Sequence, residues 1–193
     1  VSALAGALSA SLTAMVSALT HAKAKKREQE KKDLLEKLGI QAQQLAKTLT
    51  MAIDDDTAAF NRVMSAFRIK AATEEEEKHK EASIIAAYRE ATSVPLKVAE
   101  ACHQALKLSL EALKHGMQSA FSDAAVASQM AFAGFLGAGY NVRINLNELR
   151  SFKGDQSLQE YVNQTETALK KMNTDAIALI EEANKIVHQH FNP

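Results

Sequence analysis

The chain has 193 residues, with 23 Lys and Arg against 23 Asp and Glu, so its formal net charge is zero. This length is sufficient for one domain with a hydrophobic core. The charge balance argues against a surface dedicated to nucleic acid or to an anionic membrane. Helix-favouring residues predominate, with only 7 Gly and 2 Pro. The single cysteine, Cys102, excludes an internal disulfide, and its helical setting predicts a small buried side chain.

The first three helical segments follow from composition and periodicity. The segment from Val1 to about Ala24 is apolar and rich in small residues, and it lacks the basic start of a signal peptide. We predict a buried helix here rather than a membrane span. From Asp33 to Ile69, apolar residues recur at three- and four-residue steps, which is the helical period. A third helix is expected from a Thr73 cap to Gly116, with a kink near Ser93 because Pro95 removes a helix hydrogen bond.

Two further helices complete the chain. The fourth is expected to start at a cap formed by Ser122 or a neighbour, with Asp123 in its first turn. The segment "NVRINL" at 141–146 alternates like a strand, but no partner strand is evident, so we predict that it continues the helix. The last helix is expected from about 156 to 191. Residues 1–193 therefore predict one all-α domain, a bundle of about five long, partly kinked helices.

The first and fourth helices are apolar on nearly every face. A single bundle of this size encloses few helices completely, so we predict a homodimer whose interface uses these two helices. A large charge at Ala10 or Gly134 is expected to break that interface.

One group of polar residues follows the middle of the second segment. Asp56 and Phe60 are four residues apart and so share a helix face, and Arg68 and Lys70 follow. The group indicates either a solvated acidic turn or a site for a charged planar ligand.

Two more groups flank the apolar fourth segment. Ser122 and Asp123 form either a helix cap or a carboxylate that the helix start keeps ionised, ready to move a proton or hold a cationic amidine. Asn141 and Asn145 share one face, with Arg143 between them. Their amides either pair within the core or bind the donor and acceptor edge of a heterocycle. The sequence contains no metal-binding motif, phosphate loop or nucleophile elbow.

The chain resembles the cyclodeaminase domain of formiminotransferase-cyclodeaminase and its relatives that act as methenyltetrahydrofolate cyclohydrolases. The matching segments cover nearly the whole chain in the family's order: "VSALAGALSASLTAMVSALT", "DTAAFNRVMSAFRIK", "SVPLKVAE", "SDAAVA" and "GYNVRINL". The resemblance implies an all-α, dimeric fold and a proline- and glycine-rich loop just before the first helix. The family often has Gly-Asn shortly before Ser-Asp, where this chain has Gly116-Met117, so this chain lacks that amide.

The resemblance also implies a reaction and its residues. The substrate is 5-formiminotetrahydrofolate, which closes to 5,10-methenyltetrahydrofolate with loss of ammonia and needs no cofactor beyond the folate. Asp123 is expected to be the main proton-transferring carboxylate and Asp56 the second. Substrate binding is expected from the following residues: Phe60, Arg68, Lys70, Ser122, Asn141, Arg143 and Asn145. The basic residues would attract the glutamate tail or a pterin oxygen.

Three alternatives stay open at this point. The first is the related cyclohydrolase reaction on 5,10-methenyltetrahydrofolate. The second is a catalytically silent helical dimer that acts as a binding or interaction subunit. The third is a helical adaptor without a small-molecule site. We further expect a cytoplasmic protein, a polyglutamylated folate as ligand, a homodimer or higher oligomer, a formiminotransferase partner, and no association with nucleic acid or membrane.

Overall fold

A computed structural model describes residues 1–25 and 27–192 of the chain. These residues form five long α-helices and one short 3-10 helix, and no strand occurs among them. The elements are α1 (Ser2–Lys23), α2 (Gln29–Phe67), α3 (Glu74–His115), η1 (Gln118–Ala120), α4 (Phe121–Ser151) and α5 (Gln156–Phe191). The all-α prediction is confirmed, and the "NVRINL" segment is helical within α4.

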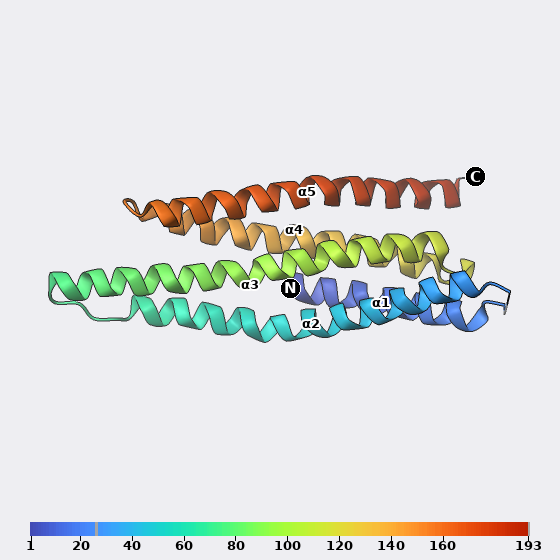
Figure 1. Ribbon diagram of the computed structural model, residues 1–193, viewed down its shortest axis with the longest axis horizontal. Helices are drawn as coiled ribbons and strands as arrows, with labels where there is room; N and C mark the ends of the chain where they lie inside the picture. Colours follow the sequence, from blue (N-terminus) through green and yellow to red (C-terminus); the bar gives the residue numbers. More distant parts are fainter. Residues whose placement is uncertain (26, 193) are drawn as a thin grey trace.

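The helices lie side by side as long rods, and the chain reverses direction at each end of the bundle (Figure 1). α2 and α3 extend along most of the bundle, whereas α1 begins halfway along it and covers one half only (Figure 1). α1 packs against α2, α3 and α4, and α5 packs against α3 and α4. In the half that α1 does not reach, α2 and α4 each pack against α3, and α1 does not lie between them.

α1 is a core helix, as predicted from its small residues. Its side chains allow close contact, and Gly6 meets Gly134 of α4 so tightly that a Cβ on Gly134 would lie 2.9 Å from the Ser2 carbonyl oxygen and 2.9 Å from the Cys102 Sγ. α1 is the one described helix long and apolar enough to cross a membrane, yet 56% of its most apolar window is buried inside the bundle. This burial agrees with the position of α1 in the core of the bundle.

The expectation that Ala10 and Gly134 would test a dimer interface is wrong. Ala10 is 1% exposed and Gly134 is buried, and both are enclosed by helices of the same chain. A charge at either position would disrupt the fold of one chain. The residues of α1 that are left uncovered form a different stripe, at Leu4, Leu8, Met15 and Leu19.

The N-terminal ends of α3 and α4 are capped in different ways. At α3 the Thr73 hydroxyl accepts from the Glu76 N–H (3.2 Å) and the Glu76 carboxylate accepts from the Thr73 N–H (3.1 Å), so the predicted cap is confirmed as a reciprocal capping box. At α4, where the cap was expected at Ser122 or a neighbour, it lies at the neighbouring Ala120 and not at Ser122 itself. Because η1 leads directly into the helix, the N-cap is Ala120, which makes no side-chain cap bond, and Ser122 already lies in the first turn. Asp123 lies in that turn as predicted.

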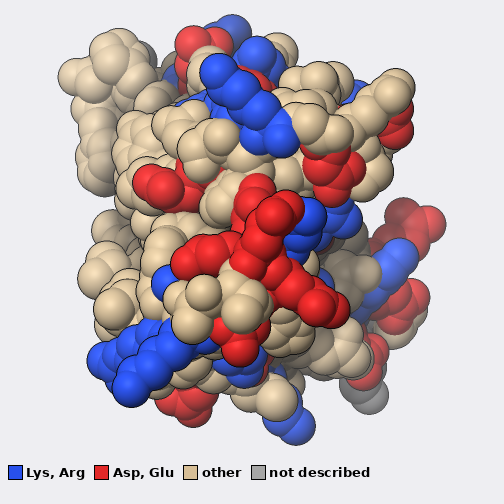
Figure 2. All heavy atoms as spheres, turned by 90° about the vertical axis from the view of Figure 1, so that its left-hand side faces the viewer, with Lys and Arg blue, Asp and Glu red and all other residues tan. Residues whose placement is uncertain are grey.

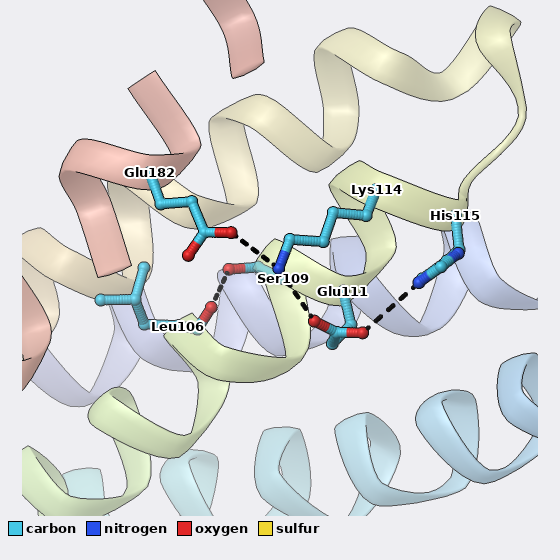
Figure 3. A network of polar contacts seen from close by, with 6 residues as sticks. All are labelled: Leu106, Ser109, Glu111, Lys114, His115 and Glu182. Atoms are coloured by element: carbon cyan, nitrogen blue, oxygen red, sulfur yellow. Dashed lines mark hydrogen bonds and ion pairs between the residues drawn. The ribbon is translucent and has the colours of Figure 1, made fainter. Parts of the chain in front are cut away.

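Charged side chains hold α5 against α3. The Lys114 ammonium lies 2.8 Å from Glu182 of α5 and 3.4 Å from Glu111, and His115 lies 3.5 Å from Glu111 (Figure 3). The hydrogen bond to Glu182 raises the pKa of Lys114 above its ordinary value. Of these three pairs, Lys114–Glu182 joins α3 to α5, whereas the other two lie within α3. Buried apolar residues supply most of the contact between the two helices.

Candidate functional site

Two adjoining cavities lie beyond the N-terminal end of α1. The larger, of about 510 Å³, is bounded by α2, α3 and α4. The smaller, of about 180 Å³, lies against Val1 and Ser2 at the start of α1. Asp56, Thr57 and Asn141 line both cavities, so the two spaces meet at these side chains. The larger of the two cavities therefore lies where α2, α3 and α4 meet, and the smaller one adjoins it at Val1 and Ser2.

α2 supplies one wall of the larger cavity. Asp56, Phe60, Met64 and Phe67 follow one another at helical spacing and share the face that lines it. Phe60 is 63% exposed, although it is a large aromatic side chain. Phe67 meets the Tyr88 ring of α3 edge to face, with ring centroids 6.1 Å apart. This wall can hold a planar ring against aromatic side chains, with the Asp56 carboxylate at its inner end.

α4 supplies the opposite wall. Asn141, Asn145 and Glu148 lie at steps of four and three residues, so one helix face carries two amides and a carboxylate into the cavity. Burial and then the negative charge of Glu148 raise the pKa of Tyr88, so its hydroxyl stays protonated and can donate. Glu148 and Tyr88 were not predicted as site residues. The three-residue step from Asn145 to Glu148 was the available signal for Glu148.

The amide of Asn145 has a specific partner in α3. Its Nδ2 donates to the Ala91 carbonyl at 2.7 Å. In a regular helix that carbonyl would accept from the backbone N–H at position 95, but Pro95 has none. Asn145 therefore satisfies an acceptor that proline leaves free, and the pairing within the bundle that the sequence offered as one alternative is present for this amide.

The predicted basic residues lie outside both cavities. Arg68 is the C-cap of α2, Lys70 follows it in the connecting turn, and Arg143 lies on α4 between the two lining asparagines without lining either cavity. Figure 2 views the end of the bundle where α2 gives way to α3 and shows acidic side chains gathered near the centre of that face, with basic ones around them. The four acidic residues Glu74–Glu77 begin α3 at this end.

The cavities are therefore negatively charged. Their lining includes the carboxylates of Asp56 and Glu148, and no Lys, Arg or His is found among the described residues that line them. Such a site favours a ligand that carries positive charge or several N–H donors.

Ser122 and Asp123 lie at the other end of α4. Asp123 precedes Asn141 by eighteen residues, which corresponds to ~27 Å along a helix. Both line neither cavity, and they follow closely after Met117, whose N–H donates to the Thr20 hydroxyl at 2.9 Å. Within one chain the structure thus brings Asp56, Phe60 and the two asparagines together but leaves Ser122 and Asp123 apart from them.

The remaining reactive side chains serve the bundle. Cys102 is fully buried, and burial raises the pKa of its thiol to about 12, so it is protonated at neutral pH, as a buried small side chain would be. His103 pairs with Asp175 of α5 at 2.8 Å. Within the part of the chain that the structure describes, no three His, Cys, Asp or Glu side chains gather in a metal-binding arrangement.

Comparison with known proteins identifies the family. The family model described as formiminotransferase-cyclodeaminase matches residues 1–167. A methenyltetrahydrofolate cyclohydrolase from Methylorubrum extorquens is 38% identical over 149 residues, which is 76% of this chain and 70% of that protein. A formimidoyltransferase-cyclodeaminase from Gallus gallus is 28% identical over 94% of this chain, and one from Rattus norvegicus is 34% identical over 52% of it. The chain spans only 33% and 19% of the lengths of these two animal proteins.

The fold agrees with these sequence relationships. The crystal structure of a formiminotetrahydrofolate cyclodeaminase from Thermotoga maritima superposes with a TM-score of 0.79, covering 98% of this chain and 86% of the other, at 21% identity. The resemblance expected from the sequence motifs is confirmed, and the chain belongs to the formiminotransferase-cyclodeaminase family.

Proposed function

We propose that this chain, as a folate one-carbon enzyme, cyclises 5-formiminotetrahydrofolate to 5,10-methenyltetrahydrofolate and releases ammonia. The observation that carries the proposal is a cavity lined by the carboxylates of Asp56 and Glu148, with no Lys, Arg or His side chain among its described lining residues, in which Asp56 stands at the meeting point of two spaces. The protonated formimino group and the methenyl product each carry one delocalised positive charge. A carboxylate beside the reacting carbon stabilises both, and the aromatic wall suits a planar ring.

The proton transfers of this reaction suit a carboxylate. The lone pair on N10 forms a bond to the formimino carbon, giving a tetrahedral carbon that bears three nitrogens. A carboxylate then accepts the proton from N10 and returns one to the departing nitrogen, which leaves as ammonia while the N5–C–N10 cation forms. The charge is conserved, and the steps require only positioning and acid–base transfer.

The second candidate is hydrolysis of 5,10-methenyltetrahydrofolate. The 38% identity to the Methylorubrum extorquens cyclohydrolase favours it. Water then attacks the same cationic carbon, and a carboxylate accepts one of its protons to leave a neutral tetrahedral carbon that bears a hydroxyl group. The C–N5 bond breaks as the hydroxyl proton passes to N5, which gives the N10-formyl product. Both reactions share the methenyl cation, so the charge of the cavity supports either one.

We propose further that two chains form a homodimer through α1. Its uncovered stripe of Leu4, Leu8, Met15 and Leu19 is 39–50% exposed and repeats along one face, and no charged residue interrupts it. Twofold pairing of identical stripes is self-complementary. An antiparallel pairing would set the partner's α1 C-terminal end beside this chain's α1 N-terminal end, where the smaller cavity lies.

That pairing would complete the site with Asp123. The Met117–Thr20 hydrogen bond ties the α3–α4 turn, and with it Asp123, to the C-terminal end of α1. Asp123 of the partner subunit would then approach the cavity that holds Asp56. We propose Asp56 from one chain and Asp123 from the other as the two acting carboxylates.

The test is the appearance of the distinct methenyl absorbance when purified protein is given 5-formiminotetrahydrofolate, with ammonia measured in parallel. The same protein given 5,10-methenyltetrahydrofolate reports hydrolysis as the disappearance of that absorbance. Formation of the absorbance with stoichiometric ammonia supports cyclodeamination, and hydrolysis alone supports the second candidate. Binding of both folates with no turnover would instead indicate a silent binding subunit.

A further inference from the structure

Pro95 occupies the interior of the 42-residue helix α3, where proline is the least favourable residue. It is buried, and the helix continues on both sides of it. Because Pro95 has no N–H, the carbonyl of Ala91 lacks the hydrogen bond that every regular helix would give it. Ala91 itself lines the larger cavity, so this acceptor belongs to a residue of the cavity wall.

The free carbonyl fixes the orientation of one amide. Asn145 donates its Nδ2 to the Ala91 oxygen at 2.7 Å across the α3–α4 contact. A carbonyl oxygen can only accept, so the amide nitrogen must face Ala91 and the amide oxygen must face away. Among the described residues, no protein group donates a hydrogen bond to the Asn145 Oδ1. This oxygen is also not among the fully buried side-chain atoms that lack a hydrogen-bond partner.

We propose that Pro95 is a positioning residue for the ligand. By leaving the Ala91 carbonyl free, it orients Asn145 so that Oδ1 is a fixed acceptor in the larger cavity. The ligand group at that point must then present an N–H, and a group that presents an acceptor would be rejected because two acceptors would face one another. The identity of the ligand rests on the proposed function, under which the amine and ring N–H of a reduced pterin are the donors.

The ring of Pro95 offers a competing explanation, because it also lines the smaller cavity. If the ring acted by direct contact, its loss would weaken binding independently of Asn145. If it acts through Asn145, its loss would have no further effect once the Asn145 amide is removed. A double-mutant cycle separates these two routes.

The experiment compares Pro95→Ala, Asn145→Ala and the double variant, with 5-formyltetrahydrofolate as a stable probe. We expect each single variant to bind the probe about tenfold more weakly, the scale of one lost hydrogen bond. The double variant should bind no worse than Asn145→Ala. At the same time the urea midpoint of Pro95→Ala should rise, because the restored N–H completes the helix. Val94→Ala is the matched control, since Val94 adjoins Pro95 and lines neither cavity.

The orientation of the amide can be followed without any folate. In the parent, one side-chain amide proton of Asn145 should exchange slowly with solvent because it is bonded to Ala91. In Pro95→Ala, the restored N–H competes for that carbonyl and the exchange should accelerate, as seen by NMR. Unchanged exchange, or binding losses that multiply to about a hundredfold in the double variant, would overturn the proposal. If the parent binds no folate at all, the proposed function fails, while the NMR comparison still decides how Pro95 acts on Asn145.

Discussion

Two variants, Asp56→Asn and Asp123→Asn, can show whether one site is built from two chains. Each substitution keeps the shape of the side chain and removes its charge and its ability to move a proton. Within one chain, Asp123 lies ~27 Å along α4 from Asn141, which lines the cavities with Asp56. The two carboxylates can therefore act on one folate only if a second copy supplies one of them.

The size of the expected loss follows from charge and proton transfer. A carboxylate about 4 Å from a cationic carbon contributes ~1 kcal/mol in bulk water and ~4 kcal/mol at an effective dielectric constant of about 20. General acid–base groups typically contribute about 100- to 10,000-fold. We therefore expect each variant to lose at least about a hundredfold in kcat/KM. Asp54→Asn removes the same charge from a position that lines neither cavity, so it should stay within a few-fold of the parent.

Mixing the two variants provides the decisive measurement. Random pairing after co-expression makes half of the dimers mixed, and each mixed dimer holds one site with both carboxylates intact. The mixture should regain about a quarter of the parental activity, measured as methenyl formation. No regain, with each variant dimeric by light scattering, would contradict the shared site. If Asp123→Asn alone is nearly as active as the parent, Asp123 has no part in the reaction.

Other predictions follow from packing and charge. Gly134→Ala should destabilise the fold, because overpacking against Ser2 and Cys102 costs ~1–3 kcal/mol while the helix gains ~1 kcal/mol. Gly139→Ala, whose Cβ would first meet Leu169 at 3.5 Å, should raise the urea midpoint instead. Leu8→Glu should yield a folded monomer by light scattering, with Gln44→Glu on exposed α2 as control; a dimer of Leu8→Glu would exclude the α1 interface. The pKa of His103 is lowered, first by burial and then by Lys107, so the unfolded chain binds more protons and stability should fall as pH drops from 6.5 toward that lower pKa. In His103→Gln, the free energy of unfolding should fall by less between about pH 7 and about pH 5.5, as measured by urea unfolding at both pH values. Arg68→Ala, Lys70→Ala and Arg143→Ala should each change KM for a polyglutamylated substrate by only a few-fold, since these residues line neither cavity; a large loss at low salt would place the tail beside them.

Helix periodicity predicts most of this fold because the signal is local. The apolar steps in α2, the Thr73 capping box and the Gly116 end of α3 lie within a few residues of their expected positions. The capping residue of α4 was not identified, because a 3-10 turn enters the helix without a side-chain cap, and no nearby residue indicates such a turn. The exposed stripe of α1 was not predicted, because the sequence alone does not show which of its faces the other helices cover.

Site residues could be predicted only where they share a helix face. Asp56 with Phe60, and Asn141 with Asn145, follow from their four-residue spacing. Tyr88 could not be predicted, because its place depends on how α3 is aligned against α2 and α4. Asp123 follows closely after Met117 in the sequence and precedes the asparagines in the family order, but order along a helix of this length is no measure of proximity.

The charge of the site indicates which part of a folate it holds. Asp56 and Glu148 would repel a tail of glutamates, and no basic residue among the described lining residues offsets them. The basic residues Arg68 and Lys70 stand beyond Phe67, at the end where Glu74–Glu77 also lie, so their attraction is partly cancelled there. Under the proposed function, such a cavity would therefore favour the cationic formimino or methenyl group over the glutamate tail. Under the proposed reaction the positive charge is present before and after ring closure. The carboxylates would then act on the barrier mainly by moving the proton from N10 to the departing nitrogen, and the geometry of that transfer is what Asn145 and the partner subunit would have to set.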